Sequence, residues 1–202
     1  MFTGIVQRKA EIVSIEKKDQ LHRLEVALAK AHQDGLTTGA SIANNGTCLT
    51  VVKMTDTAVF FDVIEETLKV TNLADLVVGS EVNIERAAKF GDEIGGHLLS
   101  GHVHTQAEIV TINRTDTNCD ICFSIDAQWL KYILPKGFIA IDGISLTLGD
   151  VDNGQFWVHL IPETLAVTNL GSRQVGERVN IEIDSQTQAI VDTVERMMLE
   201  RA

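Results

Sequence analysis

The sequence predicts an all-β protein made of two tandem copies of one small β-barrel, followed by a C-terminal α-helix. Three observations lead to this prediction: an internal repeat, alternating apolar residues in both copies, and a final segment with helical periodicity. A small barrel closes its sheet on itself and leaves no edge strand unpaired. This architecture suits two all-β units of about 90 residues each.

The repeat emerges when the chain is aligned with itself at an offset of 97 residues. Residues 1–15 (MFTGIVQRKAEIVSI) then align with residues 98–112 (LLSGHVHTQAEIVTI) without a gap. Residues 64–85 and residues 161–182 are identical at 14 of 22 positions. Because one offset holds throughout, the pattern indicates a duplicated domain rather than scattered short motifs.

Both copies have the residue pattern of β-strands. Apolar and polar residues alternate in Glu11–Ile15 and again in Glu81–Glu85, which is the period of a strand with one buried face. We expect the first barrel at residues 1–97 and the second at residues 98–187, with the joint in residues 90–96.

A helical segment follows the second copy only. Ser185 and Gln188 have the spacing of a capping box, so the helix is predicted to start here. We expect an oligomerisation helix at residues 188–202. Its apolar face consists of Ile190, Val194, Met197 and Met198. This face packs either on its own barrel or on helices of other subunits, and we favour assembly between subunits.

Composition argues against several classes of protein. The chain has 28 Asp and Glu against 17 Lys and Arg, and a net charge of −11 repels nucleic acid. No apolar run approaches the roughly 18 residues of a membrane span, and the N-terminal residues lack the pattern of a signal peptide. Three cysteines, an odd number, favour free thiols in a reducing cytoplasm.

Several long strings resemble one enzyme family. They are the MFTGIV start, NGTCLT, AAKFGDEIGGHLLSGH, KGFIAIDGISLT and HLIPETL, and together they are similar to the riboflavin synthases over essentially the whole chain. The resemblance implies two six-stranded Greek-key barrels, a C-terminal helix and a homotrimer with active sites between subunits. It leaves open an association with lumazine synthase.

The resemblance also implies the reaction, which is the last step of riboflavin biosynthesis. Two molecules of 6,7-dimethyl-8-ribityllumazine exchange a four-carbon unit, giving riboflavin and 5-amino-6-(D-ribitylamino)uracil. This transferase needs no metal and no cofactor. Fixing both reactants face to face removes much of the entropic barrier, and a duplicated domain supplies two similar pockets.

The substrate-binding residues come from the same resemblance, and each copy is expected to hold one lumazine with its own set. The first copy contributes Gly4, Ile5, Val6, Cys48, Leu49, Thr50, Asp62, Val63, Ile64, Glu65, Glu66 and Thr67. The second copy contributes Gly101, His102, Val103, Ser145, Leu146, Thr147, His159, Leu160, Ile161, Pro162, Glu163 and Thr164. Lys136 matches a family lysine that reaches the ligand of the neighbouring subunit.

Seven residues are the candidates for catalysis: Phe2, Ser41, Cys48, His102, Ser145, Thr147 and Asp184. His102 is a candidate proton acceptor or donor, because imidazole titrates near neutrality. Cys48 and Ser145 are alternative nucleophiles or water-positioning groups, and the sequence does not choose between them. Asp184 is expected to orient His102 or a serine. Phe2 either stacks on the substrate ring or orders the N-terminus.

Other interpretations of these residues are weaker. Cys119 and Cys122 resemble a redox or zinc motif, but they have no second pair and lie in a predicted strand. His97, His102 and His104 cluster without a third type of ligand at metal-site spacing, so we expect His97 to be structural and His104 to lie at the surface.

Two other functions compete with the synthase. The antenna proteins of luminous bacteria resemble the same duplicated barrel and bind one lumazine or flavin without turnover. The retained Cys48, His102 and Ser145 favour the enzyme. A barrel for single-stranded nucleic acid is disfavoured by the acidic balance and by an aromatic content of 5%.

Overall fold

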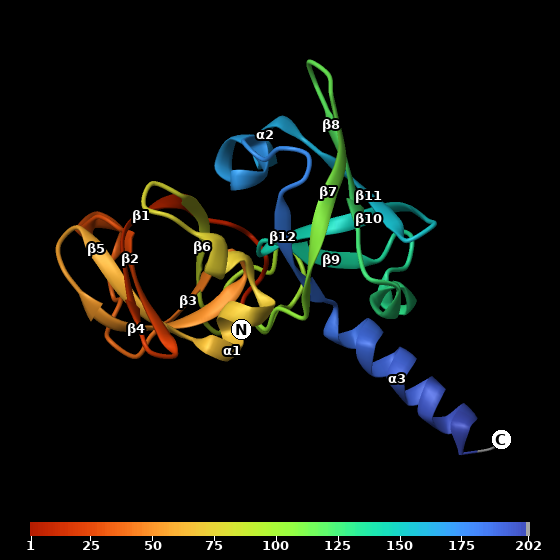
Figure 1. Cartoon of the computed structure of the whole chain (residues 1–202), viewed down its shortest axis with the longest axis horizontal. Coiled ribbons are helices and arrows are strands. Elements are labelled where there is room, and N and C mark those ends of the chain that lie inside the picture. The colour runs from red at the N-terminus through yellow and green to blue at the C-terminus, as the bar shows by residue number, and fades with distance from the viewer. Residues whose placement is uncertain (201–202) are drawn as a thin grey trace.

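The computed structural model describes residues 1–200. Two closed β-barrels lie side by side, and a helix projects from the second (Figure 1). The predicted fold is therefore confirmed. Within the described part of the chain, no helix is both long enough and apolar enough to cross a membrane.

In the first barrel the antiparallel strands are hydrogen-bonded in the closed order β1-β2-β5-β4-β3-β6. Its strands are β1 (Arg8–Lys18), β2 (Leu21–Ala27), β3 (Ser41–Asn44), β4 (Thr47–Met54), β5 (Ala58–Ile64) and β6 (Glu81–Arg86). Between them lie the helix α1 (Glu65–Val70) and the 3-10 turns η1 (Lys30–His32) and η2 (Asn72–Asp75).

The second barrel repeats this order as β7-β8-β11-β10-β9-β12. Its strands are β7 (Thr105–Arg114), β8 (Cys119–Ser124), β9 (Phe138–Ile141), β10 (Ile144–Asp152), β11 (Gln155–Leu160) and β12 (Arg178–Ile183). The helix α2 (Pro162–Val167) and the turns η3 (Ala127–Tyr132) and η4 (Asn169–Gly171) connect them. The equivalent strand order confirms the duplication that the 97-residue offset predicts.

Each barrel closes around its own apolar core. In β5 the side chains of Phe61 and Val63 are buried, whereas Asp62 between them points outward, as strand geometry requires. In the second barrel Phe123 stacks on Phe156 with ring centroids 5.3 Å apart. Full burial of one such side chain contributes about 1.5–3 kcal/mol, so both cores can hold their sheets closed.

A buried polar network joins the two barrels. The N–H of Asn72 donates to Oδ1 of Asn180 at 2.7 Å, and the N–H of Asn169 donates to Oδ1 of Asn83 at 2.8 Å. Asn169 is the repeat counterpart of Asn72, and Asn83 is the repeat counterpart of Asn180. The two bonds are therefore equivalent, with the two repeats exchanged. Because the contact is reciprocal, a local twofold axis relates the barrels.

The turn residues Asn45 and Asp142 complete this network but differ in charge. The side-chain amides of Asn83 and Asn180 donate to the carbonyls of Asp142 (3.0 Å) and Asn45 (2.8 Å), respectively. Burial raises the pKa of the Asp142 carboxyl, and the Arg173 guanidinium opposes this shift from 2.8 Å. A buried carboxylate without a partner would be costly, so Arg173 compensates for the one acid in the network.

The helix α3 (Ser185–Leu199) begins one residue after Asp184. The Asp184 carboxylate accepts hydrogen bonds from the N–H groups of Gln186 (3.4 Å) and Thr187 (2.9 Å). The predicted cap at Ser185 is therefore wrong, because a carboxylate one residue earlier satisfies the free N–H groups and the positive end of the helix dipole. Residues 201–202 of the predicted helix lie outside the described residues.

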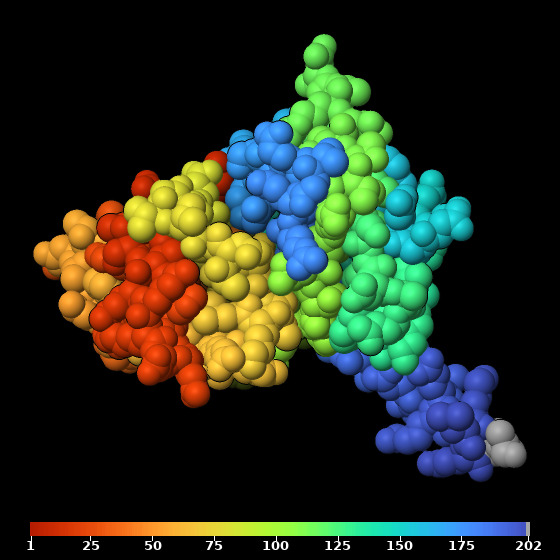
Figure 2. Space-filling model, viewed as in Figure 1, coloured from red at the N-terminus to blue at the C-terminus, as the bar shows by residue number. Residues whose placement is uncertain are grey.

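Only one side of α3 contacts its own barrel. The Tyr132 hydroxyl donates to Asp192 at 2.5 Å, and Lys131 pairs with Glu195 at 2.5 Å. Figure 2 shows the helix standing clear of both barrels along most of its length. Its predicted apolar residues are all exposed, namely Ile190, Val194, Met197 and Met198.

We expect Asn83→Ala to lower the free energy of unfolding by about 3 kcal/mol, because it leaves several buried polar groups at the barrel junction without partners. Denaturant unfolding measures this loss. Asn113→Ala, at an exposed position of β7, is the control and should change stability by less than about 0.5 kcal/mol. Equal effects of the two variants would contradict the role assigned to the network.

Candidate functional site

The predicted site residues meet across the barrel junction. The N–H of Ser145 donates to the carbonyl of Gly4 at 2.8 Å, and the N–H of Cys48 donates to the carbonyl of Gly101 at 2.8 Å. The segment that begins each repeat thus lies against β4 or β10 of the other repeat. The residues that were expected to bind one lumazine per copy are therefore not grouped by copy in space. Each cluster combines one starting segment with the strands of the opposite barrel.

Two buried glutamates fix these segments. Glu85 accepts hydrogen bonds from Thr3 and from the N–H of Gly4, and Glu182 accepts the equivalent bonds from Ser100 and Gly101. Burial raises the pKa of the Glu85 carboxyl, while the hydrogen bonds from Thr3 act to lower it. These carboxylates supply acceptors that the turning backbone needs, since the segment is not part of a sheet.

The crossing points leave no room for a side chain. A β-carbon at Gly101 would lie 2.5 Å from Cβ of Cys48, and one at Gly4 would lie 2.5 Å from Cβ of Ser145. Both glycines also have positive φ, 82° and 74°. Glycine is therefore required at both positions by backbone conformation and by the close approach of the other barrel.

The first cluster lies on the outer face of the first barrel. Cys48 and Thr50 alternate with the buried Leu49 and Val51 on β4, so their side chains point outward beside the Gly101 segment. Across this face runs a row of side chains from five neighbouring strands. This first row consists of Glu16, Arg23, Asp62, Thr50 and Ser41.

The second cluster has the same layout with different chemistry. Ser145 and Thr147 point outward from β10 beside the Gly4 segment. The equivalent second row consists of Asn113, Asp120, His159, Thr147 and Phe138. Every member of this row is the repeat counterpart of a member of the first row, at an offset of 97 residues.

His97, which was expected to be structural, lies at the second cluster. Its Nδ1 lies 2.6 Å from Oγ of Ser145, and its ring stacks on Phe138 with centroids 5.0 Å apart. Burial lowers the pKa of the His97 imidazole, and the charge of Asp184 opposes this shift. His97 precedes the first aligned residue of the second repeat. It therefore has no counterpart in the first copy, and comparison of the copies gives no signal for it.

The remaining catalytic candidates differ in their surroundings. Phe2 is buried against Leu99 and belongs to the apolar cluster on which Cys48 packs, so its ring orders the N-terminal segment beside the first cluster. Asp184 caps α3, and although burial acts to raise its pKa, hydrogen bonds from Thr187 lower it below the usual value. His102 is exposed beside the first cluster, and within the described residues its ring has no hydrogen bond.

The predicted binding residues divide into two kinds. Four have their side chains in the barrel cores, where only their backbone groups can face a ligand: Val6, Leu49, Val63 and Leu160. By contrast, Ile5, Ile64 and Ile161 are exposed, and the segments after the latter two continue into α1 and α2. Leu146 packs partly against the second core. Lys136 lies in the turn before β9 with φ of 66°.

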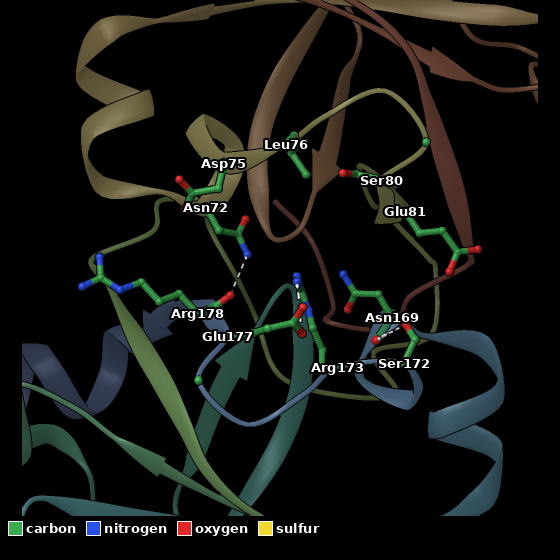
Figure 3. Close-up of a pocket in the computed structure, with 12 residues that line it drawn as sticks. Asn72, Asp75, Leu76, Ser80, Glu81, Asn169, Ser172, Arg173, Glu177 and Arg178 are labelled. Atoms are coloured by element: carbon green, nitrogen blue, oxygen red, sulfur yellow. Dashed lines mark hydrogen bonds and ion pairs between the residues drawn. The ribbon is translucent and has the colours of Figure 1, made fainter.

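The outward-facing threonines of the two clusters, Thr50 and Thr147, are both exposed. A pocket of about 610 Å³ opens at the barrel junction, lined by six pairs of repeat-related residues such as Asn72 and Asn169 (Figure 3). It contains none of the predicted site residues. A smaller pocket of about 270 Å³ includes Ile5 and Glu85. Both clusters thus present exposed side chains on the outer faces of the barrels.

Metal ligation has no geometric support in the described residues. No group of three or more His, Cys, Asp and Glu side chains there could hold an ion. Cys119 and Cys122 are both buried in β8, and burial raises the pKa of each thiol. His104, which was expected at the surface, is half-buried and lies 3.2 Å from Gln188 of α3.

The chain matches a known domain twice and resembles known enzymes along its length. The lumazine binding domain matches residues 3–87 and 100–184. Riboflavin synthase of Escherichia coli (strain K12) is 57% identical over 202 residues, covering 100% of this chain and 95% of that protein. Riboflavin synthase of Chlamydia pneumoniae is 46% identical over 198 residues, covering 98% and 97%.

Solved structures of a lumazine-binding protein share the fold. The structure of LumP complexed with 6,7-dimethyl-8-(1'-D-ribityl) lumazine superposes with a TM-score of 0.83 at 26% identity, covering 92% of this chain and all of that one. The riboflavin complex of LumP gives a TM-score of 0.84 at 28% identity with the same coverage. The sequence is thus more similar to the enzymes than to LumP.

We expect Gly101→Ala to destabilise the chain by about 3 kcal/mol, because the methyl group meets Cys48 at a backbone that already disfavours it. Gly35→Ala is the matched control, since Gly35 also has positive φ, 62°, but has open space around it. The control should lose only about 1 kcal/mol. Thermal unfolding compares the two variants, and equal losses would show that the crossing at Cys48 is not tightly packed.

Proposed function

The chain belongs to the riboflavin synthase family, and we propose that its two crossed clusters hold the two substrate molecules of that reaction. The protein converts two molecules of 6,7-dimethyl-8-ribityllumazine into riboflavin and 5-amino-6-(D-ribitylamino)uracil. The observation that carries the assignment to the clusters is their crossing, in which Ser145 meets Gly4 and Cys48 meets Gly101.

The clusters suit this reaction because they are alike in layout and unlike in chemistry. Both present a threonine, a turning glycine segment and the start of a short helix, which suits two copies of one ligand. One offers Cys48 and the other Ser145, so the two bound molecules meet different groups. A reaction between identical molecules needs this difference, since one must donate the four-carbon unit and the other accept it.

Of the two candidate nucleophiles, Ser145 has the better geometric support. Its hydroxyl lies 2.6 Å from Nδ1 of His97, which can take the proton when the hydroxyl, or a water held by it, attacks a lumazine. Burial favours the neutral, basic form of this imidazole. Within the described residues no base is hydrogen-bonded to the Cys48 thiol, which therefore lacks the activation that His97 offers to Ser145.

The open clusters support assembly as a homotrimer in which a neighbouring subunit supplies the outer wall. The apolar face of α3 gives the subunits a contact surface. In this arrangement Lys136 reaches the ligand of the neighbour. Residues 1–97 and 98–187 are the two lumazine-binding domains, and each supplies the strands of one cluster and the starting segment of the other. We place the enzyme in the cytoplasm. Association with lumazine synthase would deliver the substrate directly.

The alternative is an antenna-type protein that binds a lumazine without turnover, as the LumP complexes bind one. The function is tested by mixing the purified chain with 6,7-dimethyl-8-ribityllumazine, without metal or cofactor, and following riboflavin absorbance. We expect continued formation over many turnovers. Bound, fluorescent lumazine without riboflavin would contradict the enzyme and favour the antenna protein.

We expect Ser145→Ala and His97→Gln each to slow riboflavin formation by about 100-fold, because each removes half of one proton-transfer pair. The double variant should lose little more, since residues that act as a unit are not additive. Initial rates under saturating substrate measure this. Two losses that multiply in the double variant would show that Ser145 and His97 act independently.

Trimer formation is tested on α3. We expect Val194→Glu to convert the trimer to monomers at micromolar concentration, because it places a charge in the apolar face. Arg196→Glu introduces the same acid about 200° around the helix and should leave the trimer intact. Analytical ultracentrifugation distinguishes the two states. A trimer that survives Val194→Glu would exclude this face as the contact.

A further inference from the structure

The two rows differ most at the position beside their threonines. Thr50 is flanked by Asp62, whereas Thr147 is flanked by His159, and each of these side chains is held by the next strand. In the first row Arg23 donates to both oxygens of Asp62, at 2.7 and 2.8 Å. The order of acidic and basic side chains is therefore reversed between the rows. In the first row the acid Asp62 lies next to the threonine, and in the second row the imidazole of His159 does.

The contact with Asp120 determines which nitrogen of His159 is free. Nδ1 of His159 lies 2.6 Å from Oδ1 of Asp120. An ionised carboxylate only accepts hydrogen bonds, and the imidazole lowers the pKa of Asp120 further below its usual value. Nδ1 must then carry the proton. The neutral imidazole consequently keeps its lone pair on Nε2, the form that accepts a proton.

Gly149 provides the space in which this nitrogen lies. A β-carbon at Gly149 would lie 2.7 Å from Nε2 of His159, so any other residue would displace the ring. The equivalent residue of the first repeat is Val52, which has no imidazole to accommodate. The side chain of His159 remains 57% exposed on the outer face, on the same side as Thr147.

Asp62 cannot take the same role in the first row. Both of its oxygens accept hydrogen bonds from Arg23, which lowers the pKa of the carboxyl. A carboxylate that is stabilised in its charged form is a weak base. Of the two residues that flank the threonines, only His159 combines a fixed tautomer with a side chain that is more than half exposed.

We propose that His159, oriented by Asp120, accepts a proton from the 7-methyl group of the lumazine bound in the second pocket, which makes this pocket the donor site, whereas the nucleophile held by Ser145 and His97 adds to the other lumazine, which faces it. This inference rests on the proposed function. The methyl C–H bond breaks and an N–H bond forms at Nε2, while the electron pair stays on the substrate and spreads into its electron-poor ring. The imidazolium is stabilised by Asp120 and returns its proton to solvent.

The direct test measures abstraction of the 7-methyl proton rather than formation of riboflavin. In D2O, proton NMR records the loss of the 7-methyl signal of 6,7-dimethyl-8-ribityllumazine, and the initial rate above the uncatalysed background measures abstraction by the protein. We expect His159→Gln to lower this rate by about 100-fold. Asp120→Asn should lower it less, because the imidazole remains but its tautomer is no longer fixed.

Two controls separate chemistry from folding. His32→Gln, an exposed histidine in η1 of the first barrel, should exchange at the rate of the unmodified chain. His159→Ala should lose exchange and regain it when free imidazole is added, because the small base occupies the emptied space. A purely structural role of His159 would give no such rescue.

The outcomes also separate this inference from the function itself. If the unmodified chain makes riboflavin but His159→Gln exchanges at the full rate, His159 is not the base and the inference is wrong. If His102→Gln loses exchange and His159→Gln does not, the proton is abstracted in the first pocket, and the inference is again wrong. If the unmodified chain makes no riboflavin, the proposed function has failed.

Discussion

The hydrogen bonds that cross between the barrels are the constraint on which the rest of the structure depends. Ser145 and Cys48 each donate their N–H to a glycine carbonyl at the start of the opposite repeat. These contacts require the glycines at both crossings, and the buried asparagine network holds the barrels at the distance where they form. Without the crossing, the outer face of each barrel would lack the starting segment of the other repeat that completes its cluster.

The duplication explains both the likeness and the difference of the two clusters. Because the two barrels share one strand order, the rows through Thr50 and Thr147 occupy equivalent positions in their sheets. Substitutions within that frame then change the chemistry locally. His97 lies beside Ser145 in the second cluster, and the acid of the first row is replaced by the imidazole of His159 in the second. One chain thus obtains two unequal pockets from one fold.

The sequence predicted the architecture because its evidence is distributed over many residues. An offset of 97 residues and alternating strands survive individual substitutions, and both lead to two closed barrels. The crossing could not be predicted, since it depends on how two domains pack and not on any local pattern. For the same reason each starting segment was assigned to its own copy, although Gly4 lies at Ser145.

Residues without a repeat counterpart were the hardest to predict. His97 precedes the aligned part of the second copy, so comparison of the copies gave it no role, whereas its contact with Ser145 is immediate in three dimensions. The helix cap was misplaced by one residue because Ser185 fits a capping pattern as well as its neighbour does. Only the backbone shows that Asp184 precedes the first helical residue.

The central claim is that a single chain holds two lumazine molecules, one at each crossed cluster. It is tested most directly by the number of 6,7-dimethyl-8-ribityllumazine molecules bound per chain, measured by equilibrium dialysis with the slow Ser145→Ala variant. The account predicts two molecules per chain at saturation, with different affinities. Saturation at one molecule per chain would contradict it, because only one of the two crossed clusters would then bind a lumazine.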